Sequence, residues 1–240
     1  MLERYALAKS SGFRAVECAF PYDFPKEEIA AAKENLGLEQ ILINTYPGAN
    51  LGFAALENHQ PQFMESLNRS IEYCQALKCS RLHIMSGKVS GDVQGSEEVL
   101  KDNLIKALPL LEQAGIVGLI EPINPYWVPN YFLNDFNVGQ RLVQEINHPN
   151  LMLMLDIFHL QYLLGNLGNN VSKLLPFSGH VQIAQVPDRH EPNSEGENNY
   201  KYILQILERS NYQGWIGLEY IPQKGTDEGL RWVEEYGYSL

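Results

Sequence analysis

Seven short apolar runs, each bounded by turn-forming residues, recur along the chain. They are rich in aliphatic and β-branched residues, and their length is typical of strands rather than helices. Several are apolar at nearly every position, as expected for strands that are covered on both faces. The pattern predicts strands at residues 13–20, 40–45, 81–87, 117–124, 151–158, 180–186 and 214–220.

Segments with the periodicity of amphipathic helices lie between these runs. Pro25 and Pro61 suit the first turn of a helix, whereas Gly37 and Gly115 suit the position just after a helix ends. Thr226 suits the cap in front of the last helix. The predicted helices span residues 2–13, 25–37, 61–79, 96–115, 135–147, 200–211 and 226–237.

This alternation of strands and helices is typical of a parallel sheet. Seven such units without a break in composition favour a TIM-type (β/α) barrel, formed as a single domain over residues 1–240. No glycine-rich dinucleotide fingerprint follows any of the runs. The chain opens on a helix-like segment with no strand before it, so we expect seven of the eight barrel strands. Residues 13–20 and 214–220 would then lie at open edges.

Composition narrows the classes of partner. The net charge is −11 and no basic run occurs, so neither nucleic acid nor an anionic membrane is an expected partner. Cys18, Cys74 and Cys79 are odd in number and lack metal-type spacing, which favours free thiols in a reducing compartment. No stretch is long and apolar enough to cross a membrane, and no signal segment is evident. We therefore expect a cytoplasmic protein, whose oligomeric state the sequence leaves open.

Four oxygen-bearing side chains stand at the far ends of successive apolar runs: Glu121, Asp156, Gln182 and Glu219. Each alone could equally cap the helix that follows it. Parallel strands end on the same face of a barrel, however, so we expect the four to converge. Three carboxylates in one place repel one another unless a cation lies between them, and oxygen donors favour Mg²⁺ or Mn²⁺ over Zn²⁺. The sequence thus predicts a divalent metal held by these four residues.

Such a site suits the chemistry of α-hydroxycarbonyl compounds. A metal chelated by the carbonyl and hydroxyl oxygens would polarise the carbonyl and stabilise the enediolate that forms on proton loss. Glu121 and Glu219 could then take a proton from one carbon and return one to its neighbour. We expect these two residues to be catalytic, acting on a small hydroxy-oxo acid or sugar.

Two further residues are candidates for substrate binding. His159 follows Asp156 in a D-x-x-H arrangement, where it either packs against the barrel rim or contacts substrate. Arg189 lies in a polar loop after a strand, where a guanidinium could hold a substrate carboxylate through two hydrogen bonds. A salt bridge from Arg189 to Asp188 or Glu191 is the alternative.

Several segments carry a resemblance to a known family. LIEPIN, MLDIFHLQ, GHVQIAQVPDRHEP and GLEYIPQKGTDEGLRW resemble the hydroxypyruvate isomerase family of the xylose isomerase-like TIM barrels. The similarity runs from about Ser11 to the end of the chain. It implies interconversion of hydroxypyruvate and 2-hydroxy-3-oxopropanoate (tartronate semialdehyde). It also implies that Glu121 and Glu219 transfer the proton and bind a metal. Asp156 and Gln182 would complete the metal site, and His159 and Arg189 would contact the substrate.

Other functions remain as alternatives. A ketose 3-epimerase or a related sugar isomerase would use the same kind of site, and an inactive truncated form would keep the ligands without a complete barrel. A DNA-repair enzyme like endonuclease IV requires a histidine-rich zinc site and a basic groove, which this acidic chain does not offer.

Overall fold

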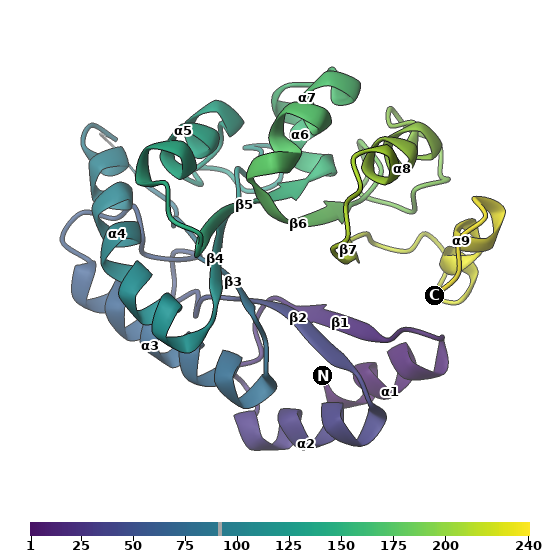
Figure 1. Ribbon diagram of the computed structural model, residues 1–240, viewed down its shortest axis with the longest axis horizontal. Helices are drawn as coiled ribbons and strands as arrows, with labels where there is room; N and C mark the ends of the chain where they lie inside the picture. The colour runs from purple at the N-terminus through teal and green to yellow at the C-terminus, as the bar shows by residue number, and fades with distance from the viewer. Residues whose placement is uncertain (91–92) are drawn as a thin grey trace. The chain divides into compact units, whose positions relative to one another are not determined.

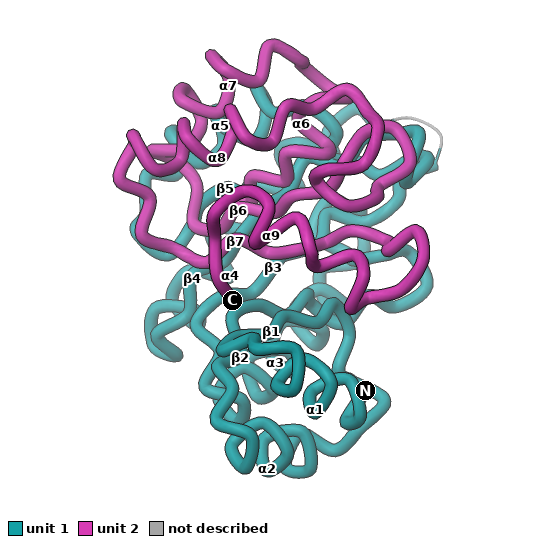
Figure 2. The backbone as a smooth tube through the Cα atoms, turned by 90° about the vertical axis from the view of Figure 1, so that its right-hand side faces the viewer, with its two compact units in different colours: residues 1–153 teal, residues 154–240 magenta. Residues whose placement is uncertain are grey.

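The computed structural model describes residues 1–90 and 93–240 and divides the chain into two compact units (Figure 2). Unit 1 spans Met1–Leu153 and unit 2 spans Met154–Leu240. The boundary falls inside strand β5 (Leu151–Asp156), so both units contain part of that strand.

Unit 1 holds four complete strands and the first half of β5. The complete strands are β1 (Ala15–Cys18), β2 (Glu39–Asn44), β3 (Arg81–His83) and β4 (Val117–Ile120). Neighbouring strands pair in parallel and in sequence order, through to β4 with β5. The helices of this unit are α1 (Leu2–Ser10), α2 (Lys26–Leu36), α3 (Gln60–Leu77), α4 (Ser96–Ala114) and α5 (Phe136–Ile146).

The helices of unit 1 lie along one side of its strands (Figure 1). Helix α4 buries an apolar stripe that includes Leu100, Leu104 and Leu111, and the strands bury Ile43 and Leu119 completely. A fully buried Leu or Ile contributes about 1.5–3 kcal/mol from its apolar area. The cover of helices explains why these strands are apolar at nearly every position.

The ends of these helices follow the predicted signals with one exception. Gly37 and Gly115 end α2 and α4 in the left-handed conformation, with φ of 62° and 68°. Pro61 lies in the first turn of α3, as predicted. Pro25 is instead the residue that precedes the first turn of α2, so it caps the helix rather than starting it.

Unit 2 contains the end of β5 and two further strands, β6 (Ser178–Ile183) and β7 (Ile216–Leu218), which pair in parallel. Its helices are α6 (Ile157–Leu163), α7 (Leu167–Leu174), α8 (Tyr200–Arg209) and α9 (Trp232–Glu235), with two 3₁₀ turns at Leu175–Phe177 and Glu228–Leu230.

Unit 2 corrects two expectations. The strand predicted at 151–158 ends at Asp156, because that side chain accepts the Phe158 backbone N–H at 2.8 Å and so starts α6. Helices α6 and α7 were not predicted. The last predicted helix, 226–237, is a 3₁₀ turn followed by the four-residue α9, and Thr226 caps neither.

All seven predicted strands occur among the described residues, in the order β1 to β7. The predicted TIM-type parallel β/α class is therefore confirmed. The open edges expected at 13–20 and 214–220 and the single domain remain predictions.

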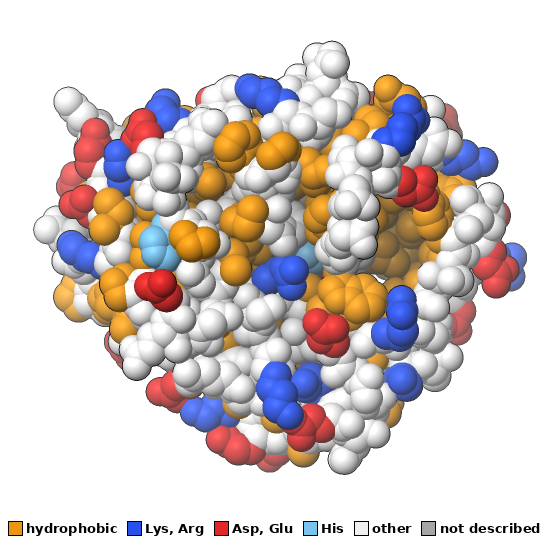
Figure 3. Space-filling view, in the orientation of Figure 1, with side chains coloured by type: hydrophobic (Ala, Val, Ile, Leu, Met, Phe, Trp, Pro, Cys, Tyr) orange, Lys and Arg blue, Asp and Glu red, His pale blue; other side chains and the backbone are white. Residues whose placement is uncertain are grey.

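The surface is chemically mixed. Acidic and basic side chains alternate over the face drawn in Figure 3, without a broad patch of one sign. None of the helices in the described ranges combines the length and apolar character that a membrane span requires.

Candidate functional site

In unit 2, three of the predicted site residues lie at or near strand ends. Asp156 is the last residue of β5 and is fully buried, and Gln182 is buried in β6. Glu219 directly follows β7, and its side chain is 45% exposed. The carboxyl ends of parallel strands are where catalytic groups of (β/α) barrels gather.

Arg189 connects two of these carboxylates. A single nitrogen, Nη2, donates to Asp156 Oδ2 at 2.9 Å and to Glu219 Oε2 at 2.7 Å. Nε donates to the backbone oxygen of Glu219 at 3.1 Å, and the guanidinium lies 4.5 Å from the centre of the Phe158 ring. Its ion pairs therefore go to the strand-end carboxylates, whereas the sequence had suggested Asp188 or Glu191 as alternative partners.

His159 belongs to the same cluster. Its Nε2 accepts a hydrogen bond from Arg189 Nη1 at 3.1 Å and lies 3.5 Å from Asp156 Oδ2. Burial lowers the pKa of His159 to about 4; Asp156 partly offsets this, and Arg189 lowers it further. The imidazole is therefore neutral near pH 7, which agrees with its role as an acceptor, because a guanidinium can only donate.

The loop that carries Arg189 has its own anchors. Gln185 exchanges two hydrogen bonds with the backbone of Asn198, donating at 3.0 Å and accepting at 2.8 Å. Buried Glu191 accepts the backbone N–H of Gln223 at 3.0 Å. Arg189 itself has a left-handed backbone with φ of 57°, a conformation that non-glycine residues adopt at some energetic cost. These contacts hold the loop backbone that carries Arg189 in place.

Sequence reasoning missed two of these contributors. Phe158 looked like one more apolar residue of its strand, yet it supplies the ring beneath the guanidinium. Gln185 was the more visible signal, because a long polar side chain buried within an apolar run must find hydrogen-bond partners.

The fourth predicted ligand, Glu121, lies in unit 1. It follows β4 and is buried, and its Oε2 is 3.5 Å from Nδ1 of His83, the last residue of β3. Both side chains are at strand ends, as predicted for Glu121.

Two carboxylates of unit 2 meet one requirement of a divalent-cation site, which is that their oxygens converge. Asp156 and Glu219 already direct one oxygen each at the same positively charged nitrogen of Arg189. Their separation from that nitrogen is only slightly longer than the 2.0–2.6 Å that Mg²⁺ or Ca²⁺ takes to oxygen. The convergence of two carboxylates on one positive atom is the feature that a cation site requires.

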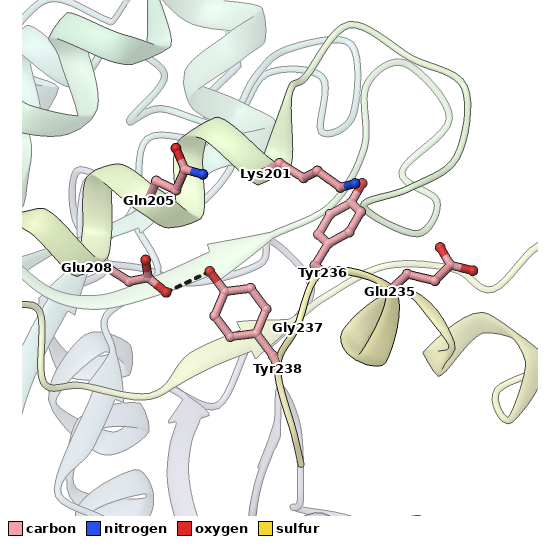
Figure 4. Close-up of a pocket in the computed structure, with 7 residues that line it drawn as sticks. All are labelled: Lys201, Gln205, Glu208, Glu235, Tyr236, Gly237 and Tyr238. Carbon is pink, nitrogen blue, oxygen red and sulfur yellow. Dashed lines mark hydrogen bonds between the residues drawn. The ribbon is translucent and has the colours of Figure 1, made fainter.

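Unit 2 also has a hollow of about 280 Å³ elsewhere, between α8 and residues 235–238 (Figure 4). In it, Lys201 lies 4.9 Å from the ring centre of Tyr236, and Tyr238 donates to Glu208 at 2.8 Å. These side chains contact one another at the surface and offer no buried acid or base for catalysis.

Comparisons with known proteins agree on one family for this chain. The model of the xylose isomerase-like TIM barrel family matches residues 5–236. A putative hydroxypyruvate isomerase of Danio rerio is 42% identical over 98% of this chain and 89% of its own length. A 2-oxo-tetronate isomerase of Cupriavidus necator is 37% identical over 98% of this chain and 92% of its own.

Solved structures extend the likeness. A crystal structure described as an AP endonuclease, family 2, from Brucella melitensis has a TM-score of 0.94 at 40% identity, covering 98% of this chain and 93% of that one. D-Psicose 3-epimerase from Clostridium cellulolyticum has a TM-score of 0.77 at 17% identity, covering 95% and 82%. At that identity, the second comparison shows a shared fold alone.

Proposed function

The chain belongs to the xylose isomerase-like TIM barrel family and is an isomerase, and we propose that it interconverts hydroxypyruvate and 2-hydroxy-3-oxopropanoate. The observation that carries the proposal is the buried cluster of Asp156, His159 and Arg189 with Glu219 at its exposed side. It combines acid–base groups with the cationic Arg189, and the Glu219 side chain, 45% exposed, brings the cluster into contact with solvent.

The relatives support this class of substrate. Their names specify hydroxypyruvate and 2-oxo-tetronate, and both compounds carry a carboxylate, a carbonyl and a hydroxyl on three successive carbons. An isomerase of either compound moves a proton between the same two carbons. The proposal therefore commits to a 2-oxo acid with a hydroxyl on the next carbon, with hydroxypyruvate as the first choice.

We assign the proton transfer to Glu121 and Glu219. One carboxylate removes a proton from the hydroxyl-bearing carbon, which gives an enediolate, and the other glutamate returns a proton to the former carbonyl carbon. The hydroxyl proton moves to the other oxygen, so the reaction needs no oxidant or reductant. Glu219 is suited to meet the substrate because it is half exposed, whereas the burial of Glu121 excludes water from its carboxylate.

The proposed metal ligands are Asp156, Gln182 and Glu219, with Glu121 as the fourth. A Mg²⁺ or Mn²⁺ ion bound there would polarise the substrate carbonyl and stabilise negative charge on the enediolate oxygens. Asp156 is suited to the task because its other oxygen is fixed by the N–H of Phe158, so the carboxylate cannot rotate freely.

His159 and Arg189 are proposed to bind and orient the substrate. Neutral His159 can donate or accept a hydrogen bond without adding charge, and burial holds the ring in one orientation. Arg189 offers a planar guanidinium that matches a substrate carboxylate. A cytoplasmic location is part of the proposal, supported by three free cysteines.

The experiment is NMR of hydroxypyruvate with the Mn²⁺- or Mg²⁺-loaded protein in D₂O. Isomerisation should appear together with deuterium at the carbon that receives the proton. Glu121→Gln and Glu219→Gln should each lower kcat by at least about 100-fold, because the shape and an oxygen remain while the basic carboxylate is lost. Glu208→Gln, on the surface of α8, is the matched control and should keep full activity.

The same experiment tests the rival substrates. If free ketoses turn over faster than hydroxypyruvate, the protein is a sugar epimerase or isomerase and the acid substrate is wrong. Faster turnover of 2-oxo-tetronate would keep the reaction and change the length of the substrate. Near-normal activity of either glutamine variant would remove that glutamate from the proton transfer.

A further inference from the structure

Both N–H groups on Nη2 of Arg189 are already engaged in hydrogen bonds. Nη2 carries two N–H groups, and one binds Asp156 while the other binds Glu219. Nε binds the backbone oxygen of Glu219, and Nη1 binds His159. The two carboxylate oxygens on this edge are the same atoms that a metal ion would need from these residues.

Two cations cannot share these oxygens at close range. A divalent ion placed within bonding distance of Asp156 Oδ2 and Glu219 Oε2 would lie next to Nη2, so two positive charges would stand close together. The burial of Arg189 and Asp156 makes this repulsion stronger than it would be at the surface.

We propose that Arg189 is an internal cation that competes with the divalent metal for Asp156 and Glu219, so that metal loading displaces its guanidinium from both carboxylates. This inference rests on the metal site of the proposed function and adds a role that Arg189 plays before substrate arrives. In the metal-free protein, Arg189 holds the two carboxylates together and neutralises their repulsion. In the loaded protein, its Nη2 edge is free for the carboxylate of an acidic substrate.

The displacement resolves a conflict between two roles of one side chain. Arg189 cannot bind a substrate carboxylate in a bidentate manner while Asp156 and Glu219 occupy Nη2. The loop is held by Gln185 and Glu191 rather than by these ion pairs, so the guanidinium can move while the loop stays in place.

The first test measures Mn²⁺ binding, through the electron paramagnetic resonance signal of free Mn²⁺. Arg189→Met removes the competitor, so the Kd for Mn²⁺ should fall on the order of 10-fold, as expected when the binding-competent state is no longer a minor population. Arg209→Met removes the same charge from the surface of α8, where Arg209 donates to Gln205, and should leave the Kd within about 2-fold.

The outcomes separate this inference from the proposed function. A Kd for Arg189→Met that equals or exceeds the wild-type value overturns the competition while the metal site stands. Absence of Mn²⁺ binding in wild type and in Arg189→Met overturns both. Tighter binding by Arg189→Met in a protein that does not isomerise hydroxypyruvate leaves the competition in place and rejects the substrate.

A second measurement uses the unaltered protein, in case Arg189→Met does not fold. The Nε–H signal of Arg189 in ¹⁵N NMR, assigned by its loss in Arg189→Lys, should shift and exchange faster with solvent when Mg²⁺ is added to saturation. A signal that stays unchanged at saturating Mg²⁺ would show that the guanidinium keeps its partners, and the proposal would fail.

Discussion

Two buried polar clusters in this protein differ in what they do with charge. In unit 1, Tyr5 of α1 donates to Gln40 Oε1 at 2.6 Å, and Gln40 lies 3.7 Å from the sulfur of Cys18. In unit 2, the Arg189 guanidinium joins Asp156 and Glu219. The first cluster is neutral, because burial raises the pKa of the Cys18 thiol to about 11 and the pKa of Tyr5 above its usual range.

The two clusters are expected to contribute differently to stability. A neutral hydrogen bond between side chains of α1 and β2 fixes a helix to the sheet and adds about 0.5–1.5 kcal/mol. A buried ion pair carries a large desolvation penalty, so it is weak evidence for stabilisation. The charged cluster lies at the carboxyl ends of strands, where barrel enzymes place their catalytic groups, which agrees with the role proposed for it.

The largest expected effect comes from Asp156→Ala. It leaves the buried Arg189 guanidinium without the Asp156 carboxylate and leaves α6 without its cap, so the free energy of unfolding should fall by about 3–5 kcal/mol. Urea unfolding followed by circular dichroism measures the loss. The matched control is Asp135→Ala, because Asp135 caps α5 in the same way but has no buried ion pair, and should lose only about 1 kcal/mol.

Equal losses in the two aspartate variants would break the comparison. Asp156 would then act as a helix cap alone, and the charged cluster would add no more to stability than the neutral one. A larger loss in Asp156→Ala that is reversed by adding Arg189→Met would instead show that the unpaired guanidinium is the cause.

A smaller effect is expected in the neutral cluster. Tyr5→Phe keeps the ring but removes the donor to Gln40, so the free energy of unfolding should fall by about 1–2 kcal/mol while hydroxypyruvate turnover stays unchanged. Tyr238→Phe is the control, since its hydroxyl binds Glu208 at the surface and its loss should change stability by less than about 0.5 kcal/mol. A loss of turnover in Tyr5→Phe would mean that the neutral cluster is not purely structural.

The two clusters also differ in how far the sequence predicts them. Asp156 and Glu219 could be predicted because a polar residue at the end of an apolar run stands out, and parallel strands bring such ends together. Tyr5 could be placed on the apolar side of its helix, but its partner Gln40 could not. The pairing joins residues 35 positions apart, and it depends on how α1 packs on the sheet.

The contacts of Arg189 could not be predicted from the sequence, for a different reason. Its direction depends on a left-handed backbone in a loop whose course is set by Gln185 and Glu191. Loop conformations of this kind leave no periodic trace in the sequence. The end of β5 could not be placed because the apolar run from Leu151 continues into the apolar residues of α6. The signal for the boundary was Asp156, which caps that helix.

The smallest expected effect on stability belongs to Glu219→Gln. Glu219 is 45% exposed, so its pair with Arg189 is screened by water and its loss should lower the free energy of unfolding by at most about 1 kcal/mol. Glu228→Gln, which breaks the surface pair with Lys224 at 3.2 Å, should behave alike in urea unfolding. The two variants should differ in turnover: Glu219→Gln should abolish it, whereas Glu228→Gln should leave it unchanged. A stability loss in Glu219→Gln as large as that of Asp156→Ala would mean that both carboxylates anchor Arg189 equally, and the division between a buried anchor and an exposed catalytic group would be wrong.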